Sequence, residues 1–275
     1  MPAVYAHHRF GWEVCALLPP AEQAVLWDHA GLFTLGLQGP DILFHYHPLR
    51  ANPVARLGHG MHERPGGEFF RPAAEKFRRA GAQPGDLAYL LGFLCHFLLD
   101  TFCHGYVEEQ ARTGPMDHVT METAFDRMLQ VRDGLDPLRH RPAAVLEPSR
   151  ANAAVIAGFF PSLTAGQIRQ AIRGMVRDGD LMRAPGRGKE LLLTAGLKLA
   201  GQYGALGGLM VTRRANPLCR ESTQTLWTIY QQAVPRAAEQ LRGYRRYLSG
   251  EGSLDPLYEQ TFVPRTAREG AGSRP

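Results

Sequence analysis

Three metal-ligand side chains recur at every fourth residue in and just after an apolar stretch of the chain. His96, Asp100 and His104 belong to or follow segment 87–99, whose other residues are Leu, Phe, Ala, Gly, Tyr and Cys. At about 100° per residue, a four-residue step returns a helix almost to the same direction, so the three side chains share one face. We therefore expect a helix in which His96 and Asp100 are buried. A buried carboxylate without a partner is costly, and a bound metal ion would remove that cost.

The same four-residue step returns at His118 and Glu122, after the helix-breaking pair Gly114-Pro115. Imidazole nitrogens and carboxylate oxygens suit Zn²⁺, and three protein ligands per ion leave one position open for water. A single histidine on an apolar helix is commonly a core residue bonded to a backbone carbonyl, and an isolated pair is commonly a surface contact. Five potential ligands at this spacing favour metal binding over that structural interpretation.

Apolar residues recur at three- and four-residue spacing along most of the chain, as in amphipathic helices. Segments with strand-like alternation of Val, Ile and Thr are nearly absent. We expect an all-α fold, a multi-helix bundle over residues 1–262 with its metal site between facing helices, and a disordered tail at 263–275. The helices are expected at 21–29, 68–79, 87–110, 116–132, 152–159, 165–177, 189–199 and 221–248.

The segment between residues 31 and 67 is rich in Gly and Pro, which indicates irregular loops. It contains two further potential metal ligands, Asp41 after Gly39-Pro40 and His62 ahead of a Gly-rich turn. Loops of this kind can fold over a site. An ordinary turn residue at Asp41 and a surface side chain at His62 remain the alternatives.

Composition and charge restrict the class of protein. The 275 residues, 44% hydrophobic and 21% charged, are enough to bury a large core. The formal net charge of +5 mildly supports an anionic substrate such as a phosphate ester. The first residues lack a signal-like apolar run, and segment 87–99 is too short to span a bilayer, so we expect a cytoplasmic protein. Its four cysteines are expected to be reduced thiols.

A second run, from Leu191 to Val211, is apolar enough to suggest contact with a membrane. Lys198, Gln202 and several glycines interrupt it. We therefore expect a helix packed in the core and followed by a loop.

Taken in order, these ligand types resemble those of the zinc-dependent phospholipase C family, which is related to the fungal zinc nucleases with three metals. The matching residues are His7, Asp41, His62, His96-x3-Asp100-x3-His104 and His118-x3-Glu122, over roughly the first half of the chain. The resemblance implies up to three Zn²⁺ ions. One would be held by Asp41, His62, His96 and a shared Asp100, and another by His104, His118 and Glu122.

The resemblance also implies a zinc that shares Asp100 and is bound by His7 together with the amine and carbonyl of the mature N-terminal residue. Secreted relatives expose a tryptophan there, whereas this chain begins Met1-Pro2. A methionine followed by a small residue is favoured for removal, so Pro2 is the expected ligand. His8 competes with His7, and the order of the family's ligands favours His7.

The resemblance implies a zinc-dependent phosphoric diester hydrolase of the phospholipase C type, in which a metal-bound hydroxide attacks phosphorus in line. Asp41 is the expected catalytic proton acceptor. Asp117 and Asp126 are candidates to orient histidine N–H groups, or else are solvated helix charges. Phospholipid is the leading substrate, and peripheral contact with membrane lipid is a further expectation.

Other functions stay open at this point. Nucleic acid is not excluded as a substrate, so a single-strand nuclease-like phosphodiesterase is one alternative, and a non-catalytic zinc-binding helical protein is another. A di-iron bundle is disfavoured because the chain lacks paired ExxH motifs. An HD-type phosphohydrolase is disfavoured because no His-Asp doublet occurs.

Overall fold

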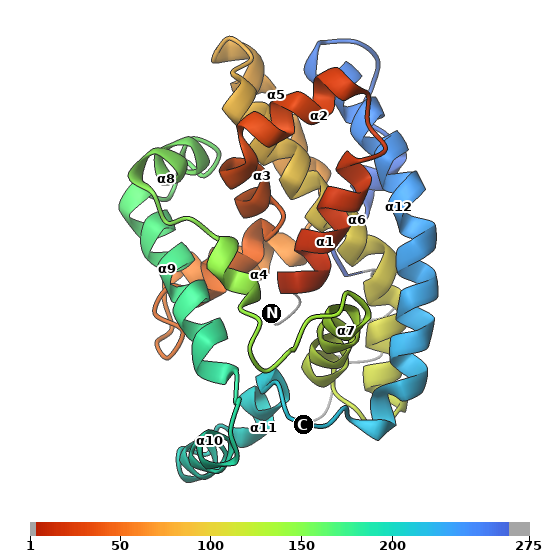
Figure 1. Cartoon of the computed structure of the whole chain (residues 1–275). Helices are drawn as coiled ribbons and strands as arrows, with labels where there is room; N and C mark the ends of the chain where they lie inside the picture. Colours follow the sequence, from red (N-terminus) through yellow and green to blue (C-terminus); the bar gives the residue numbers. More distant parts are fainter. Residues whose placement is uncertain (1–3, 264–275) are drawn as a thin grey trace, which may run out of the picture.

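The computed structural model describes residues 4–263. Pro2 and the predicted tail from 264 to 275 lie outside the described residues, while Val263 is buried. The described chain is helical, with no strand and two isolated bridges, and this confirms the predicted all-α fold (Figure 1). The α-helices are α1 (Val4–Cys15), α2 (Pro20–Asp28), α3 (Ala30–Gly36), α4 (Pro53–His62), α5 (Gly67–Arg79), α6 (Pro84–Thr113), α7 (His118–Arg132), α8 (Arg150–Ala157), α9 (Ala165–Met182), α10 (Arg187–Leu199), α11 (Tyr203–Leu206) and α12 (Arg220–Leu248).

Helix α6 is the centre of the molecule and contains His96, Asp100 and His104. Pro84 begins it, where its fixed φ and missing N–H cost nothing. Helices α1, α3 and α12 pack around it (Figure 1). α6 is long and apolar enough to cross a bilayer, but 89% of its most apolar window is buried inside the protein. It is therefore the core helix that the sequence predicts.

Two glycines bring α3 unusually close to α6. A Cβ at Gly36 would overlap the backbone of α6, and a Cβ at Gly92 would overlap the backbone of α3. The 3-10 helix η1 (Gly39–His45) follows α3 and is thereby held against α6. Gly39 has a φ of +50° and leaves no room for a Cβ beside the ring of His96. This close contact delivers Asp41 to the ligand face of α6.

The prediction of irregular chain from 31 to 67 is wrong in part, because this segment contains α3, η1 and α4. Pro53 stands at the first position of α4, and the side chain of Asn52 accepts a hydrogen bond from the amide of Ala55. This is an N-cap followed by a first-turn proline, which begins a helix rather than interrupting one. His62 is the last residue of α4.

Aromatic side chains fasten the C-terminal segment onto the core. Phe70 and Phe97 contact Tyr258 of the 3-10 helix η5 (Pro256–Glu259), and the ring of Phe262 packs against Phe97. Phe262 also contacts the ring of His96. The chain after η5 thus closes one side of the ligand cluster. All four cysteines are buried and unpaired, as expected.

The expectation of a packed core helix in the run from 191 to 211 is wrong. Helix α10 has no buried residue, and Figure 1 shows it projecting beyond the lower end of α9. The short α11 and the 3-10 helix η3 (Gly207–Leu209) follow it. The predicted helix at 189–199 is present as α10, but it is exposed rather than packed in the core.

Candidate metal centre

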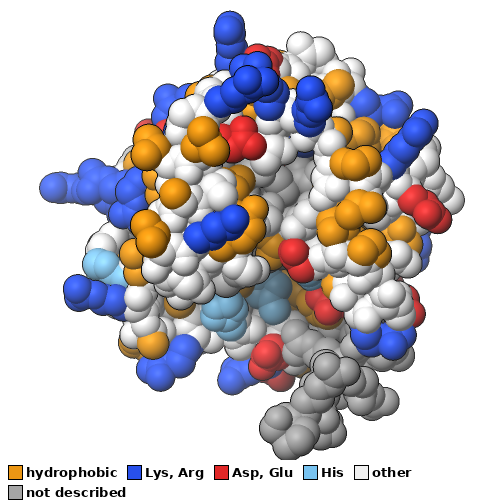
Figure 2. Space-filling view, turned by 90° about the horizontal axis from the view of Figure 1, so that it is seen from below, with side chains coloured by type: hydrophobic (Ala, Val, Ile, Leu, Met, Phe, Trp, Pro, Cys, Tyr) orange, Lys and Arg blue, Asp and Glu red, His pale blue; other side chains and the backbone are white. Residues whose placement is uncertain are grey.

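All the predicted ligands inside the described residues converge on one place. α1, η1, α4, α6 and α7 deliver their side chains into three groups, and within each group the ligand atoms lie within 4.8 Å of one another. Figure 2 shows histidine and acidic side chains gathered in a hollow on the lower face of the molecule. The three groups are His7, His96 and Asp100; Asp41, His62 and His96; and His104, His118 and Glu122.

The group of Asp41, His62 and His96 lies around one oxygen of Asp100. Oδ2 of Asp100 lies 3.1 Å from Nε2 of His96 and 3.9 Å from Nε2 of His62. Oδ1 of Asp41 lies 3.0 Å from Nε2 of His62 and 4.0 Å from Nε2 of His96. Two imidazoles and two carboxylates thus face a common point, which is a donor set that suits Zn²⁺.

The other oxygen of Asp100 faces different histidines. Oδ1 lies 3.3 Å from Nε2 of His7 and 3.6 Å from Nε2 of His104. The carboxylate therefore points one oxygen at each of two imidazole sets, which is how a carboxylate bridges two cations. His8, the competing ligand, lies elsewhere, because its Nε2 accepts a hydrogen bond from the indole of Trp12. The structure brings His7, and not His8, into the cluster.

The last group joins α6 to α7. Oε1 of Glu122 lies 3.1 Å from Nε2 of His104 and 3.0 Å from Nε2 of His118. Asp117 caps α7 by accepting a hydrogen bond from the amide of Thr120 at 2.8 Å. Asp117 therefore fixes the start of the helix that presents His118 and Glu122, and it orients no histidine in the structure.

Four histidines are oriented in the same way. In each, Nδ1 contacts an oxygen, which leaves Nε2 facing the cluster. The pairs are His62 with Gly58 O at 2.9 Å, His96 with Leu37 O at 3.3 Å, His104 with Phe262 O at 3.0 Å and His118 with Glu108 Oε1 at 2.6 Å. An Nδ1–H that donates to oxygen sets the tautomer whose Nε2 lone pair can bind a metal. These oxygen partners, three of them backbone carbonyls, were not identifiable from the sequence.

Several buried polar atoms of this cluster make no hydrogen bond of regular geometry, although oppositely charged groups lie nearby. They are Nδ1 of His7, Oδ1 of Asp41, Nε2 of His62, His96 and His118, and Oε2 of Glu122. Buried polar atoms are nearly always hydrogen-bonded, so such a concentration needs an explanation. A cavity of about 30 Å³ lies among His7, Asp100, His104 and Glu122, which is enough for an ion or a water molecule. The residues present fit bound zinc.

The electrostatics of the metal-free chain agree with that fit. Burial alone would raise the pKa of Glu122, but His118 and His104 lower it to about 2. Burial would lower the pKa of His118, but the carboxylates of Glu122 and Glu108 together outweigh it and raise the value to about 11. Burial opposes ionisation of Asp100 as well, and His104 and His96 hold its pKa well below the usual range. The acids are therefore ionised and ready to bind a cation.

Asp126 contacts the backbone of α1 immediately before His7. It is buried, and its carboxylate accepts hydrogen bonds from the amides of Tyr5 at 3.0 Å and Ala6 at 2.8 Å. Burial raises its pKa to about 7 despite these two bonds, which act in the opposite direction. Both expectations for Asp126, a partner of a histidine N–H and a solvated charge, are wrong. It caps the first turn of α1, whose next residue is His7.

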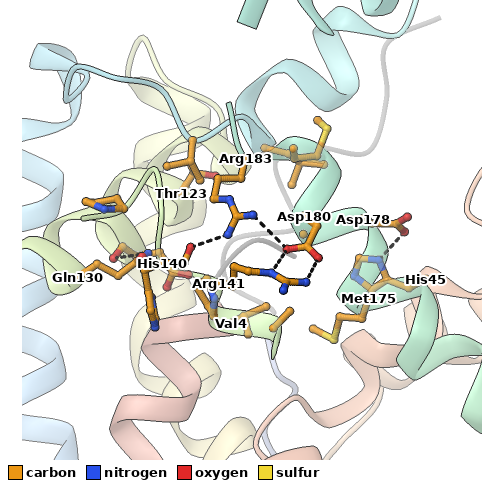
Figure 3. Close-up of a pocket in the computed structure, with 18 residues that line it drawn as sticks. Val4, His45, Thr123, Gln130, His140, Arg141, Met175, Asp178, Asp180 and Arg183 are labelled. Carbon is orange, nitrogen blue, oxygen red and sulfur yellow. Dashed lines mark hydrogen bonds and ion pairs between the residues drawn. The ribbon is translucent and has the colours of Figure 1, made fainter. Parts of the chain in front are cut away.

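A cavity of about 110 Å³ lies beside the cluster (Figure 3). Its wall includes Val4, one turn before His7, and Thr123, next to Glu122. Nδ1 of His45, the last residue of η1, lies 2.9 Å from Oδ2 of Asp178, and its Nε2 is buried without a hydrogen-bond partner.

The rest of that wall combines charge with apolar surface. Arg141 donates to Asp180 at 2.8 Å, and Arg183 lies 3.4 Å from the same carboxylate. Met175, Met182, Leu209 and Val211 supply apolar surface. The cavity is therefore a mixed polar and apolar site bounded by the elements that carry the ligands.

Comparison with known proteins agrees with this geometry. The model of the family described as zinc dependent phospholipase C matches residues 6–171, a span that contains every predicted ligand from His7 to Glu122. No curated protein matches the chain, and no solved structure does so. The match covers more than half of the sequence and includes the whole cluster. The chain belongs to the zinc-dependent phospholipase C family.

Proposed function

We propose that this protein is a zinc-dependent phosphodiester hydrolase that acts on phospholipids as a phospholipase C. The observation that carries the proposal is the carboxylate of Asp100, whose two oxygens face two different sets of imidazoles. That arrangement is suited to two cations held close together on one phosphate ester. Membership of the family supports the same reaction.

The ligand assignment follows the three groups. Asp41, His62, His96 and Asp100 would hold one zinc, and His104, His118 and Glu122 another. His7 and Asp100 would hold a third zinc, with Pro2 as the proposed N-terminal ligand. When bound, the zinc ions supply positive charge that lowers the pKa of water and stabilises the phosphoryl oxygens.

The side chains of this chain supply the rest. His62 and His96 keep Asp41 ionised although its burial acts against it. We assign this carboxylate as the acceptor of the proton of the attacking water. That water's oxygen forms the new bond to phosphorus, the bond to the diacylglycerol oxygen breaks, and the proton taken up by Asp41 passes to that leaving oxygen. The products are diacylglycerol and a phosphorylated alcohol. The cavity bounded by His45, Arg141 and Arg183 would receive the headgroup.

The test combines metal counting with hydrolysis. Zinc per chain is measured by inductively coupled plasma spectrometry, and turnover is measured on bis-p-nitrophenyl phosphate, on phospholipid micelles and on a single-stranded oligonucleotide. We expect more than one zinc per chain and release of a phosphorylated alcohol from phospholipid. Cleavage of the oligonucleotide alone would indicate a nuclease, and full zinc with no product from any ester would indicate a non-catalytic zinc protein.

Two matched variants of α6 sharpen that test. Asp100→Asn should lose both zinc ions that share the carboxylate, and hydrolysis should fall by more than the roughly 10–100-fold that changes around a metal ligand cause. Asp86→Asn alters another buried carboxylate of the same helix, which pairs with Lys76 away from the cluster, and should keep its zinc. Full zinc and full turnover in Asp100→Asn would refute the assignment of Asp100 as the bridge.

A further inference from the structure

Helix α10 turns its apolar side chains outward. Leu191, Leu192 and Leu199 are 70%, 75% and 89% exposed, and no residue of the helix is buried. In a helix that lies on a protein surface, the apolar stripe normally faces the core. Leu193 and Leu197 lie on the partly shielded side of α10, but the other three leucines face solvent, so the free surface of the helix is apolar as well.

The outward face is continuous along the helix. With about 100° per residue, six of the exposed positions fall on an arc of roughly 140°, and the other two, Arg187 and Lys198, lie just outside one edge of it. The arc contains only apolar and small side chains, and its members are Gly188, Leu191, Leu192, Ala195, Gly196 and Leu199. The partly shielded positions, among them Glu190 and Leu193, lie on the opposite side.

Cations border this arc on both sides. Arg187 and Lys198 stand at one edge, and Lys189 stands at the other. Lys189 also donates to the carbonyl oxygen of Asp180 at 2.8 Å, which ties the start of α10 to the end of α9. An apolar face bordered by Lys and Arg is the pattern of a helix that lies in the plane of a lipid surface.

The position of α10 fits that role. Figure 1 shows α10 at the lower end of the molecule, and Figure 2, seen from below, shows exposed hydrophobic side chains beside the hollow that contains histidine and acidic side chains. Arg183, Leu209 and Val211, which flank α10 and α11 in the sequence, line the cavity beside the ligand cluster. A surface bound to α10 therefore lies on the face where the site opens.

We propose that α10 docks this protein onto an anionic lipid surface, with Leu191, Leu192 and Leu199 in the acyl boundary and Arg187 and Lys198 against lipid phosphates. The proposal deepens the proposed function, on which the choice of lipid as the occupant rests. A second copy of α10 fits less well, because it would bring the same three cations together with Glu190 as the only acid of the helix. The helix lies outside residues 6–171, the part of the chain that matches the family model.

The experiment uses the zinc-loaded full chain and vesicle flotation. Wild type is compared with a variant carrying Leu191→Gln, Leu192→Gln and Leu199→Gln, since glutamine keeps helix propensity and removes the apolar surface. The matched control carries Leu49→Gln and Leu218→Gln, two leucines that are 84% and 60% exposed elsewhere. Vesicles contain phosphatidylglycerol with phosphatidylcholine, or phosphatidylcholine alone.

We expect the α10 variant to lose about tenfold or more in vesicle binding, with a parallel loss of phospholipid hydrolysis and unchanged turnover of soluble bis-p-nitrophenyl phosphate. The control variant should bind as wild type does. Arg187→Gln with Lys198→Gln should weaken binding to the anionic vesicles about tenfold and leave binding to phosphatidylcholine nearly unchanged.

Equal binding of wild type and the α10 variant would overturn the proposal. So would a wild type that elutes as a dimer, does not float, and becomes monomeric in the α10 variant, because the occupant would then be a second copy. Loss of binding in the α10 variant without hydrolysis of any ester by wild type would support docking and reject the proposed function.

Discussion

In the metal centre, ionisable side chains are buried among apolar ones; in α10, apolar side chains are exposed among charged ones. Asp100 and His96 are almost inaccessible to solvent, whereas Leu192 and Leu199 are largely in it. Each region breaks the usual distribution of polar and apolar groups in the opposite direction. Each mismatch calls for something that the chain itself does not contain, a cation in the first case and an apolar surface in the second.

Removal of the metal should give the largest change in stability. Chelation leaves the buried acids and imidazoles to compensate one another, and it removes the stabilisation that a tightly bound ligand gives the native state. We expect the chelated protein to melt at a temperature lower by roughly 10 °C or more, as several kcal/mol would produce in a chain of this size. Calorimetry of loaded and chelated protein checks this, and identical melting curves would mean that no metal occupies the cluster.

Overpacking the close contact between α3 and α6 should have the next largest effect. Gly92→Ala places a methyl group on the backbone of α3, and overpacking of this kind costs about 1–3 kcal/mol. Because α3 leads into η1, zinc bound through Asp41 should also weaken. Denaturant unfolding and zinc titration measure the two effects. Gly243→Ala in α12, where a Cβ meets no atom within 4 Å, is the control and should be neutral or stabilising.

Weakening the Asp126 cap of α1 should lower the affinity for one zinc ion more than it lowers the stability of the fold. In Asp126→Asn, one carboxylate oxygen becomes an NH₂ group that cannot accept from the amide of Tyr5 or Ala6. We expect one zinc to bind roughly 10–100-fold more weakly while the other two are retained. Asp133→Asn is the control, because Asp133 bonds the side chains of Arg9 and Tyr5 at a more exposed position. Equal losses in the two variants would show that Asp126 does not position His7.

The pH dependence of stability should differ in direction between the two forms. Without metal, the raised pKa of His118, about 11 against an ordinary 6.5, gives stability that is full below pH 6.5 and is lost as the pH approaches 11. The lowered pKa of Glu122, about 2 against 4.5, gives stability that is full above pH 4.5 and is lost towards pH 2.

Between pH 6 and 8 the metal-free protein should therefore lose stability through His118, while the contribution of Glu122 stays constant. The zinc-loaded protein should gain stability over that interval, because protons compete with zinc for imidazole nitrogen. Melting temperatures of both forms across the interval make the comparison. A metal-free protein that gains as much as the loaded one would contradict it.

The smallest expected change concerns α10. Replacing its three exposed leucines by glutamine should alter the free energy of unfolding by no more than about 0.5 kcal/mol, as for surface substitutions away from special features. Chemical denaturation measures this value. A loss of several kcal/mol would show that the leucines are packed in solution, and the contrast with the metal centre would fail.

The sequence predicted most helices and the members of the cluster, for identifiable reasons. A four-residue step on one helix places His96, Asp100 and His104 on a common face whatever the rest of the fold does. The helices in the segment from 31 to 67 were missed because Gly and Pro also occur at helix beginnings and close contacts. The orientation of α10 was missed because its composition is the same whether its leucines face the core or solvent.

The sequence by itself determined the helical periodicity, the burial of α6 and the identity of the ligand types, because these depend on side-chain chemistry and on spacing along one helix. Only the tertiary structure decided which oxygen of Asp100 faces which imidazole, that His7 rather than His8 enters the cluster, that Asp126 caps α1, and that α10 stands apart from the core. These relations join residues far apart in the chain, and their distances depend on how the helices pack against one another.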